Sequence, residues 1–113
     1  MSCIFCQIAA GTIPADILHK DDKVIAFRDI RPQAPTHVLI VPVKHIASLS
    51  DIRGDDFGLV AYVFDLANDL AHSEGISEKG YRVTVNSGKE GGQVVQHLHF
   101  HLLGGRQLSG ELG

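Results

Sequence analysis

The sequence predicts an α+β fold with a mainly antiparallel five-stranded sheet and one long helix. Three observations lead to this prediction: short apolar segments of strand length recur along the chain, residues 55–75 have helical periodicity, and the links between the strand segments are short. Parallel neighbours would each require a crossover helix, and one helical segment cannot supply them. An antiparallel sheet is therefore favoured over a parallel α/β arrangement.

Length and composition favour a single domain spanning residues 1–113. The chain is 44% hydrophobic and 20% charged, which is typical of a folded protein rather than a disordered one. Its formal net charge of −3 argues against nucleic acid or a membrane surface as the partner. The opening residues MSCIFCQIAAG resemble neither a signal peptide nor a membrane anchor, so we expect a cytoplasmic location and a small-molecule partner.

The first three strands are predicted between residues 17 and 43. Residues 17–30, ILHKDDKVIAFRDI, contain two apolar runs around a charged tetrapeptide, which predicts a hairpin. Two prolines make residues 31–37 a loop. Residues 38–43, VLIVPV, are continuously apolar and rich in β-branched side chains, as in a strand buried on both faces, and Pro42 is expected at its end.

The helix predicted over residues 55–75 has a wide apolar surface. Two apolar stripes run side by side along it, and Gly75 is expected to end it. Such a helix needs more cover than one sheet face provides, so we expect it to pack against a second subunit in a homodimer. The stripes consist of Phe57, Val60, Phe64, Ala67 and Ala71, and of Leu59, Val63, Leu66 and Leu70.

The last third of the chain contains two more strand segments joined by a glycine-rich loop. Residues 81–86, YRVTVN, alternate as a strand does. Residues 87–93, SGKEGGQ, form the loop, and residues 94–103, VVQHLHFHLL, are predicted to be the last strand. The remaining histidines outside motifs, His19 and His72, are expected on the surface.

Three histidines alternate with apolar residues in the last strand. On a strand, His97, His99 and His101 would share one face while the residues between them enter the core. Serine or threonine would serve equally well on a merely solvated face, so three histidines in strict alternation indicate chemistry. Neighbouring rings could share a metal, but the outer two begin about 13 Å apart, too far for one zinc ion with ligands at about 2.0–2.1 Å.

Nucleophilic catalysis suits this arrangement better than a shared metal. A neutral imidazole has a free lone pair that can attack phosphorus, provided that donors hold the phosphoryl oxygens and an acid lies near the leaving group. His99 is central and is the natural nucleophile, with His101 as the acid. The glycines of the preceding loop allow backbone N–H groups to face an anion.

The motif HLHFHLL fits the pattern His-φ-His-φ-His-φ-φ, with φ apolar, and thereby resembles the histidine triad (HIT) family. DIRPQAPTHVLIVPVKHI (29–46), GYRVTVNSGKEGGQ (80–93) and LLGGRQL (102–108) are similar to the Hint branch of that family. The resemblance implies a HIT-like fold and hydrolysis of nucleoside 5′-phosphoramidates, in which adenosine or guanosine monophosphate is linked to an amine. It implies a nucleotidyl-histidine intermediate on His99 and no cofactor for the chemistry.

Two other functions stay open at this point. A dinucleoside polyphosphate hydrolase or nucleotide transferase would use the same superfamily site. A non-catalytic purine nucleotide-binding or regulatory module would keep the pocket without turnover.

The resemblance also implies roles for individual residues. His99 would be the nucleophile, His101 would assist the leaving group, and His97 and His37 would complete the set of active-site histidines. Asp29 matches the position that hydrogen-bonds the ribose, although an aspartate here could equally be a turn residue. The ligand implied is a purine nucleoside monophosphate or its phosphoramidate. The positions implied to contact the base are Ile4, Phe5, Ile8, Phe27 and Ile30, although these apolar residues could equally be core without a ligand. The positions implied near the sugar and phosphate are Asn86, Gly92, Gln93 and Val94.

One position departs from the family pattern. Many Hint proteins have a serine second after the double glycine, and this chain has Val94. Because valine has no side-chain donor, only the Val94 N–H remains there. Leaving-group protonation is therefore expected to depend more on His101, and the preferred leaving group is in question.

Cys3 and Cys6 form a CxxC pair with the spacing of a zinc half-site, and no second CxxC completes it. Some bacterial HIT proteins and the related uridylyltransferases are similar in adding two histidines. By that resemblance His45 and His97 would complete a structural zinc site that joins the N-terminus to the histidine strand. The alternative is a pair of free thiols.

Overall fold

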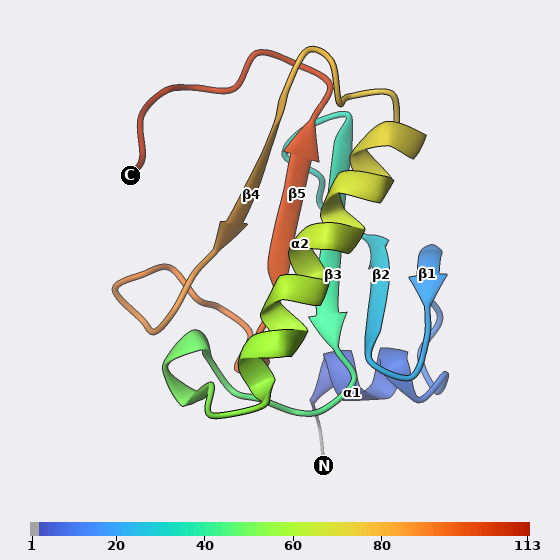
Figure 1. The fold of residues 1–113 in the computed structure, drawn as a ribbon, viewed down its shortest axis with the longest axis vertical. Coiled ribbons are helices and arrows are strands. Elements are labelled where there is room, and N and C mark those ends of the chain that lie inside the picture. Colours follow the sequence, from blue (N-terminus) through green and yellow to red (C-terminus); the bar gives the residue numbers. More distant parts are fainter. Residues whose placement is uncertain (1–2) are drawn as a thin grey trace.

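Five strands form one antiparallel sheet in the computed structural model, which describes residues 3–113 (Figure 1). The strand order is β1-β2-β3-β5-β4, and every neighbouring pair is antiparallel. The predicted α+β class is therefore confirmed. The elements in chain order are α1 (Ile4–Ala9), β1 (Ile17–Lys20), β2 (Val24–Arg28), β3 (Thr36–Pro42), a 3-10 turn (Leu49–Asp51), α2 (Asp56–Ser73), β4 (Tyr81–Val85) and β5 (Phe100–Gly104).

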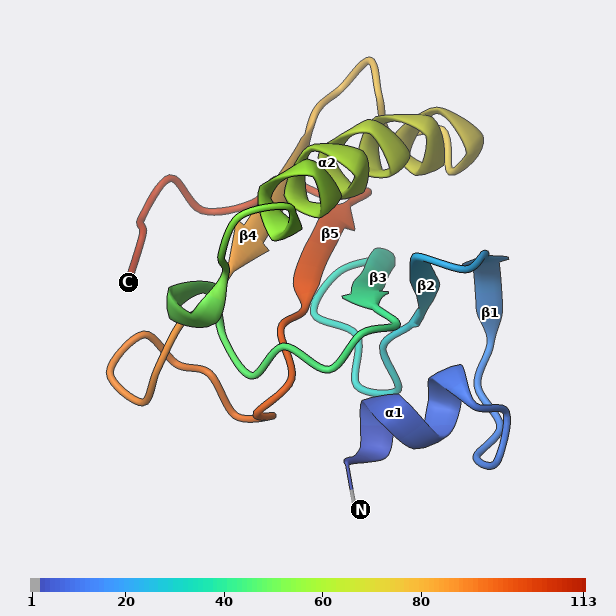
Figure 2. The ribbon, with the colours of Figure 1, turned by 60° about the horizontal axis from the view of Figure 1, so that its bottom comes forward.

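The two helices cover opposite faces of the sheet (Figure 2). Under α2 lies the larger apolar cluster, which includes Val38, Ile40 and Phe100 from the sheet and Val63 and Ala67 from the helix. Under α1 lies a smaller cluster, which contains Phe5, Ile8, Ile25, Phe27, Leu39 and Val41. Strand β3 contributes alternate residues to both clusters, and all seven of its residues are buried. The prediction of a strand buried on both faces is confirmed.

The hairpin, the buried strand and the long helix occur where they were predicted, with shifted ends. β3 begins at Thr36, so it includes two residues assigned to the loop, and Pro42 is its last residue as expected. α2 ends at Ser73, and Gly75 follows with a φ of +72°. Helix α1 was not predicted, although the spacing of Ile4, Phe5 and Ile8 is compatible with one helical face.

The predicted last strand, residues 94–103, is wrong in its first half, because β5 begins only at Phe100. The register of the ladder explains the difference. Ile40 pairs with Phe100, so Pro42 would lie opposite Leu98 if the ladder continued. Proline has no N–H to donate, and the ladder ends before it. The N–H of Leu98 instead donates to the carbonyl oxygen of Ile46 at 2.7 Å.

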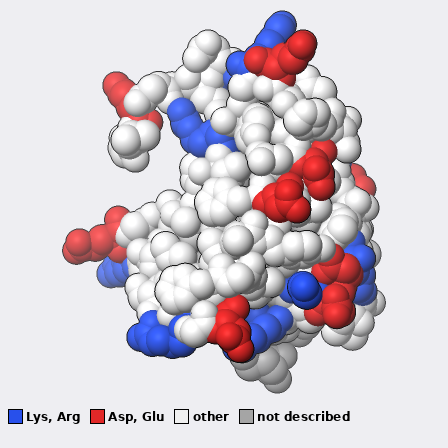
Figure 3. Space-filling model, in the orientation of Figure 1, with Lys and Arg blue, Asp and Glu red and all other residues white. Residues whose placement is uncertain are grey.

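Two aromatic side chains of α2 are largely exposed, although the ring of Phe64 also packs edge-on against Phe100 of the core. Phe57 is 62% exposed and Phe64 is 48% exposed. In Figure 3 an uncharged area lies over the lower part of β4 and the adjoining part of α2, below the blue side chains at the upper left. Strand β4 lies at the end of the strand order, so its outer edge has no neighbouring strand within residues 3–113. No helix in the described part of the chain is long and apolar enough to cross a membrane.

Candidate active site

The three histidines of the motif lie on the α1 side of the sheet, and the residues between them lie on the α2 side. Leu98, Phe100 and Leu102 belong to the core under α2, as predicted. The rings of His99 and His101 have centroids 5.0 Å apart, whereas the ring of His97 contacts the cysteine pair. The alternation therefore persists through His97 and His99, although these residues lie outside the strand ladder.

A backbone carbonyl determines which nitrogen of His99 carries the hydrogen. Nδ1 of His99 lies 2.8 Å from the carbonyl oxygen of His97. Because a carbonyl can only accept, Nδ1–H is the donor, and a neutral His99 has its lone pair on Nε2. The ring is 5% exposed and packs edge-on against Phe5, with centroids 5.2 Å apart. A neutral His99 therefore presents an unprotonated Nε2 from a position fixed by the His97 carbonyl oxygen and Phe5.

A backbone N–H determines the opposite arrangement in His101, through His37. The N–H of Gln33 donates to Nδ1 of His37 at 3.0 Å, so a neutral His37 carries its hydrogen on Nε2. That Nε2 lies 2.9 Å from Nδ1 of His101. His101 therefore accepts at Nδ1 and carries its own hydrogen on Nε2. The two neighbouring rings thus differ chemically: His99 offers a lone pair, and His101 offers an N–H.

Burial keeps the rings of His37 and His101 neutral at physiological pH. Burial and the neighbouring His99 and His37 lower the pKa of His101 to about 4, with Asp29 opposing the shift. Burial also lowers the pKa of His37, again against the attraction of the Asp29 carboxylate. In the free protein, His101 is therefore a neutral hydrogen-bond donor at pH 7. A bound phosphoryl anion would favour its protonated form.

Asp29 lies at the edge of the histidine group, directly after β2. One carboxylate oxygen accepts the N–H of Arg31 at 2.8 Å, as a turn aspartate does. The other oxygen lies 3.5 Å from Nε2 of His37. The carboxylate is partly exposed, so it serves the turn and still has acceptor capacity for a ligand.

Hydrogen bonds from the side chains of Asn86 and Gln93 hold the glycine-rich loop in its conformation. Asn86 donates from Nδ2 to the carbonyl oxygen of Gly91 at 2.7 Å. A Cβ on Gly91 would lie 2.4 Å from the Ser87 carbonyl oxygen, so this position requires glycine. Gln93 is buried, accepts the N–H of Gly88, and donates to the carbonyl oxygens of Ala47 and Val95 at 2.7 and 3.0 Å. The Gln93 amide is thus engaged within the protein and holds the loop.

The remaining loop and base positions divide into exposed and buried groups. Gly92 is exposed, and Val94 is 86% exposed with no recorded partner for its N–H within residues 3–113. Phe5, Ile8 and Phe27 are buried and form core between α1 and the sheet, whereas Ile4 is 45% exposed and Ile30 is 91% exposed. Ile4 and Ile30 are therefore the members of the predicted base slot whose apolar surface remains open to a ligand.

Four side chains converge at the other end of the histidine motif. Sγ of Cys3 lies 3.3 Å from Nδ1 of His97, and Sγ of Cys6 lies 3.2 Å from Nδ1 of His45 and 3.6 Å from Nδ1 of His97. All four donor atoms lie within 4.8 Å of one another. A tetrahedral zinc ion with ligands at about 2.0–2.3 Å separates its ligands by roughly 3.3–3.8 Å. The four residues predicted as metal ligands are therefore placed together, and their donor set suits zinc.

A second group of donors, Asp29, His37 and His101, is equally compact but does not suit a metal. A metal-binding histidine normally donates its other N–H to an acceptor. His97 meets this requirement, since its Nε2 lies 2.8 Å from the carbonyl oxygen of Pro42. His37 does not, because its Nδ1 faces the N–H donor of Gln33. The hydrogen-bonding partners thus distinguish a metal site from a proton-bearing one.

Two backbone partners were missed by sequence reasoning, namely the N–H of Gln33 and the carbonyl oxygen of Pro42. Neither has a side-chain signal in the sequence. His72 is exposed as expected, but His19 is half-buried and lies 2.7 Å from the Asp21 carboxylate. A hollow of about 780 Å³ between the C-terminal segment and the α2–β4 connection contains none of the predicted site residues.

Comparisons with known proteins identify the family. The HIT domain family matches residues 10–108. The chain is 47% identical over 105 residues to the purine nucleoside phosphoramidase of Escherichia coli (strain K12), covering 93% of this chain and 88% of that protein. The crystal structure of a HIT family hydrolase from Legionella pneumophila is 53% identical, with a TM-score of 0.96, over 99% of this chain and 100% of that chain.

A metal-containing relative is also similar. The crystal structure of a zinc-bound histidine triad family protein from Mycobacterium smegmatis is 30% identical, with a TM-score of 0.81. The match covers 94% of this chain and 76% of that chain.

Proposed function

This chain belongs to the HIT domain family and is a HIT family hydrolase, and from that premise we propose that it hydrolyses purine nucleoside 5′-phosphoramidates. The substrate class is carried over from the phosphoramidase of Escherichia coli, which is 47% identical. The products would be a purine nucleoside monophosphate and a free amine. No cofactor is needed for this chemistry.

One observation supports the proposal most directly: the ring of His99, whose neutral form has its lone pair on Nε2, lies beside the ring of His101, which carries its hydrogen on Nε2. The carbonyl oxygen of His97 determines the tautomer of His99. The hydrogen bonds from Gln33 to His37 and from His37 to His101 determine the tautomer of His101. A nucleophile and a hydrogen-bond donor on adjacent rings are what displacement at phosphorus requires. The centroid separation of 5.0 Å allows both to reach one phosphoryl group.

The proposed reaction has two displacement steps. In the first, Nε2 of His99 attacks phosphorus, the P–N bond to the amine breaks, and the amine takes a proton from a protonated His101, the form that the bound phosphoryl anion favours. In the second, water attacks the nucleotidyl-histidine, the P–N bond to His99 breaks, and the nucleoside monophosphate is released. His99 returns to its neutral form, and the proton released from water returns to His101, which replaces the proton given to the amine.

The surrounding residues would bind the nucleotide. Asp29 would accept the ribose hydroxyls with its free acceptor capacity, and Ile4 and Ile30 would cover the base. Exposed backbone N–H groups of the glycine-rich loop, including that of Val94, would face the phosphoryl oxygens. Asn86 and Gln93 would act by holding this loop in shape.

A structural zinc ion bound by Cys3, Cys6, His45 and His97 is part of the proposal. Bound zinc would contribute folding free energy by cross-linking the N-terminus to the chain before β5. His97 would serve it through Nδ1 while its Nε2–H remains on the carbonyl oxygen of Pro42. Two free thiols and this donor set suit a reducing compartment, so we assign the protein to the cytoplasm.

We further propose a homodimer formed through α2 and β4. Phe57 and Phe64 are exposed on α2, and the adjoining surface over the lower part of β4 is uncharged (Figure 3). The outer edge of β4 has no neighbouring strand within residues 3–113, so it could pair with the same strand of a second copy. A self-complementary apolar patch of this kind is typical of two-fold dimers.

The test compares an adenosine phosphoramidate with diadenosine polyphosphates as substrates for wild type and His99→Ala. We expect turnover of the phosphoramidate to be at least about 10³-fold lower in the variant, with binding of adenosine monophosphate retained. The exposed His72→Ala serves as the matched control and should behave as wild type. Faster turnover of diadenosine polyphosphates would instead indicate the alternative hydrolase, and nucleotide binding without any turnover would indicate a regulatory module.

A further inference from the structure

Arg106 holds the segment that carries Gln33. Its Nε and Nη2 both donate to the carbonyl oxygen of Gln33, at 3.1 and 2.9 Å, and its Nη1 donates to the carbonyl oxygen of Gln107 at 2.9 Å. Two N–H groups of the Arg106 guanidinium therefore donate to the same carbonyl oxygen. Arg106 and Gln33 are 73 residues apart in the sequence. Arginine is suited to this role because its donors form a rigid planar fork.

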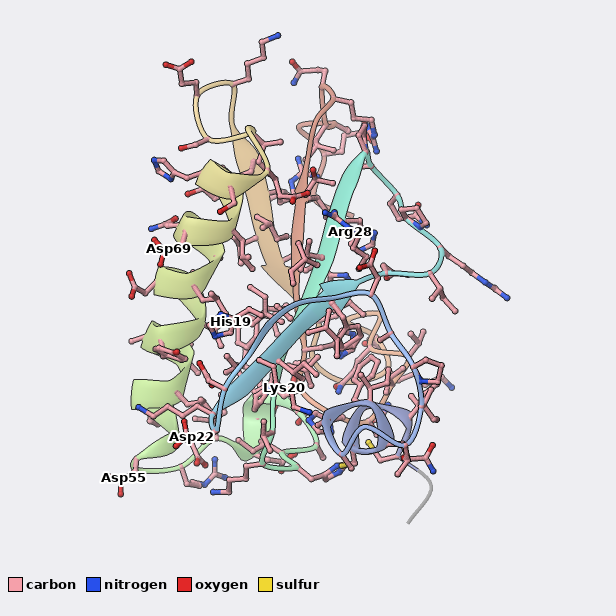
Figure 4. The ribbon with its side chains drawn as sticks, turned by 90° about the vertical axis from the view of Figure 1, so that its right-hand side faces the viewer. His19, Lys20, Asp22, Arg28, Asp55 and Asp69 are labelled. Carbon is pink, nitrogen blue, oxygen red and sulfur yellow. The ribbon has the colours of Figure 1, made fainter. Side chains whose placement is uncertain are left out.

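The segment beside Arg106 is shaped to bring the guanidinium close. Gly105 has a φ of +94°, and a Cβ at that position would lie 2.9 Å from Cβ of Pro35. Only glycine permits both this backbone conformation and this approach. The residues after β5 therefore pack directly on the 31–35 loop, which has no regular secondary structure of its own. Figure 4 shows this loop at the end of β2, where Arg28 is labelled.

A chain of hydrogen bonds, in which each donor and acceptor is fixed, begins at Gln33. Gln33 is exposed, and its N–H reaches Nδ1 of His37, whose Nε2–H reaches Nδ1 of His101. Each link has one possible direction once the Gln33 N–H is in place. The final link leaves the hydrogen of His101 on Nε2, beside His99.

We propose that Arg106 is a positioning residue, which holds Gln33 so that His37 and His101 each keep their hydrogen on Nε2. This inference rests on the proposed function, because the tautomer matters only if His101 donates to the reacting phosphoryl group. Without the hydrogen bonds from Arg106, the exposed loop that contains Gln33 can move, and the Gln33 N–H can lose its hydrogen bond to His37. His37 can then carry its hydrogen on Nδ1, and the relay can reverse so that His101 has a lone pair on Nε2. Two adjacent lone pairs cannot supply a donor to the leaving group.

The test uses the Arg106→Met variant of the full chain. Histidine ring nitrogens are assigned by NMR, since protonated and unprotonated nitrogens have distinct ¹⁵N shifts, and phosphoramidate turnover is measured in parallel. In wild type we expect the hydrogens of His37 and His101 on Nε2. In Arg106→Met we expect a mixture of tautomers at both rings and a kcat about tenfold lower, with KM changed less than about twofold.

Arg53→Met is the matched control. The Arg53 guanidinium also donates to two backbone carbonyl oxygens, those of Ser50 and Ile52. It belongs to the segment between the 3-10 turn and α2, which Figure 1 shows at the opposite end of the sheet from the connection between β2 and β3. This variant should keep both the tautomers and kcat. If Arg106→Met does not unfold cooperatively, Arg106→Lys carries the test, because an ammonium keeps the charge but lacks the planar fork of donors.

The outcomes separate the two proposals. Unchanged tautomers in Arg106→Met overturn the positioning role whatever happens to kcat, and mixed tautomers with an unchanged kcat overturn it as well. A wild type with the expected tautomers but no phosphoramidate turnover contradicts the proposed function instead. Mixed tautomers with a reduced kcat, absent in Arg53→Met, support the role of Arg106.

Discussion

The carbonyl oxygen of His97 accepts a hydrogen bond from Nδ1 of His99 at 2.8 Å. The same residue points its ring nitrogen Nδ1 toward Cys3 and Cys6. One residue therefore belongs to the cysteine–histidine group through its side chain and orients the candidate nucleophile through its backbone. Phe5, from α1, packs edge-on against both rings. The proposed metal site and the proposed catalytic site are thus mechanically connected.

Metal removal is expected to destabilise the protein and to reduce its activity. If zinc pins α1 to His97, chelation should release about one zinc ion per chain and lower the midpoint of thermal unfolding by about 10 °C, the equivalent of roughly 2 kcal/mol for a domain of this size. Differential scanning calorimetry with and without chelator measures this change. Cys6→Ser should already have the lower midpoint and should not respond to chelator. A wild type that carries no zinc and is indifferent to chelator would refute the site.

Stability is expected to fall as the pH drops from about 6.5 to about 4. The pKa of His101 is lowered to about 4 by burial, so the unfolded chain binds a proton in this window that the folded chain does not. Stability from this group is complete above the unfolded pKa and is lost as the pH falls through the window. The effect is at most about 3 kcal/mol, since each pKa unit corresponds to about 1.4 kcal/mol.

Urea unfolding at several pH values measures this dependence. His101→Asn should flatten the decline, whereas the exposed His72→Asn should leave it unchanged. An equally steep decline in His101→Asn would assign the acid sensitivity to other groups.

Val94→Ser is expected to broaden the range of leaving groups. A serine hydroxyl can donate where Val94 offers only its N–H, and such a hydrogen bond contributes about 1 kcal/mol. Substrates with a poorly leaving alkyl amine should gain about fivefold in kcat/KM, and those with an aryl amine should gain little. The ratio of the two substrates within one variant is the control. An equal gain for both would mean that the hydroxyl acts on binding rather than on the leaving group.

The ion pair between Arg28 and Glu74 is expected to stabilise the fold measurably. Nη1 and Nη2 of Arg28 donate to the two carboxylate oxygens of Glu74 at 2.8 and 3.0 Å, which joins the end of β2 to the end of α2. Glu74→Gln should lower the free energy of unfolding by about 1–2 kcal/mol. Lys44→Met removes a more exposed pair with Asp56 and should cost less than about 0.5 kcal/mol. Equal effects would show that geometry and burial do not distinguish the two pairs.

A charge on the exposed face of α2 is expected to dissociate the proposed dimer. Phe57→Glu places a carboxylate in the apolar area, where pairing with a second copy would bury it without a partner. Light scattering after size exclusion should give twice the chain mass for wild type and the chain mass for this variant. Ile17→Glu, at the opposite edge of the sheet, is the control and should remain dimeric. A monomeric wild type would end this proposal.

Periodicity predicted most of the architecture because it reports which residues are buried. The hairpin over residues 17–30, the buried strand around 38–42 and the helix around 56–73 each have a pattern that admits one local structure. The last strand was predicted too long because its limit depends on another segment. Pro42 ends the ladder from the neighbouring strand, and nothing within residues 94–99 records this.

The amino-acid sequence by itself determined that three histidines would line one side of the chain with apolar residues on the other, and that two cysteines would stand near the N-terminus. Only the tertiary structure decided what each ring could do. His97, His99 and His101 are the same residue type in the same pattern, but one faces thiols, one presents a lone pair and one presents an N–H. The physical reason is that the partners of an imidazole determine which nitrogen is protonated, and here they come from Pro42, Gln33 and the His97 carbonyl oxygen, backbone groups that folding alone brings to the rings.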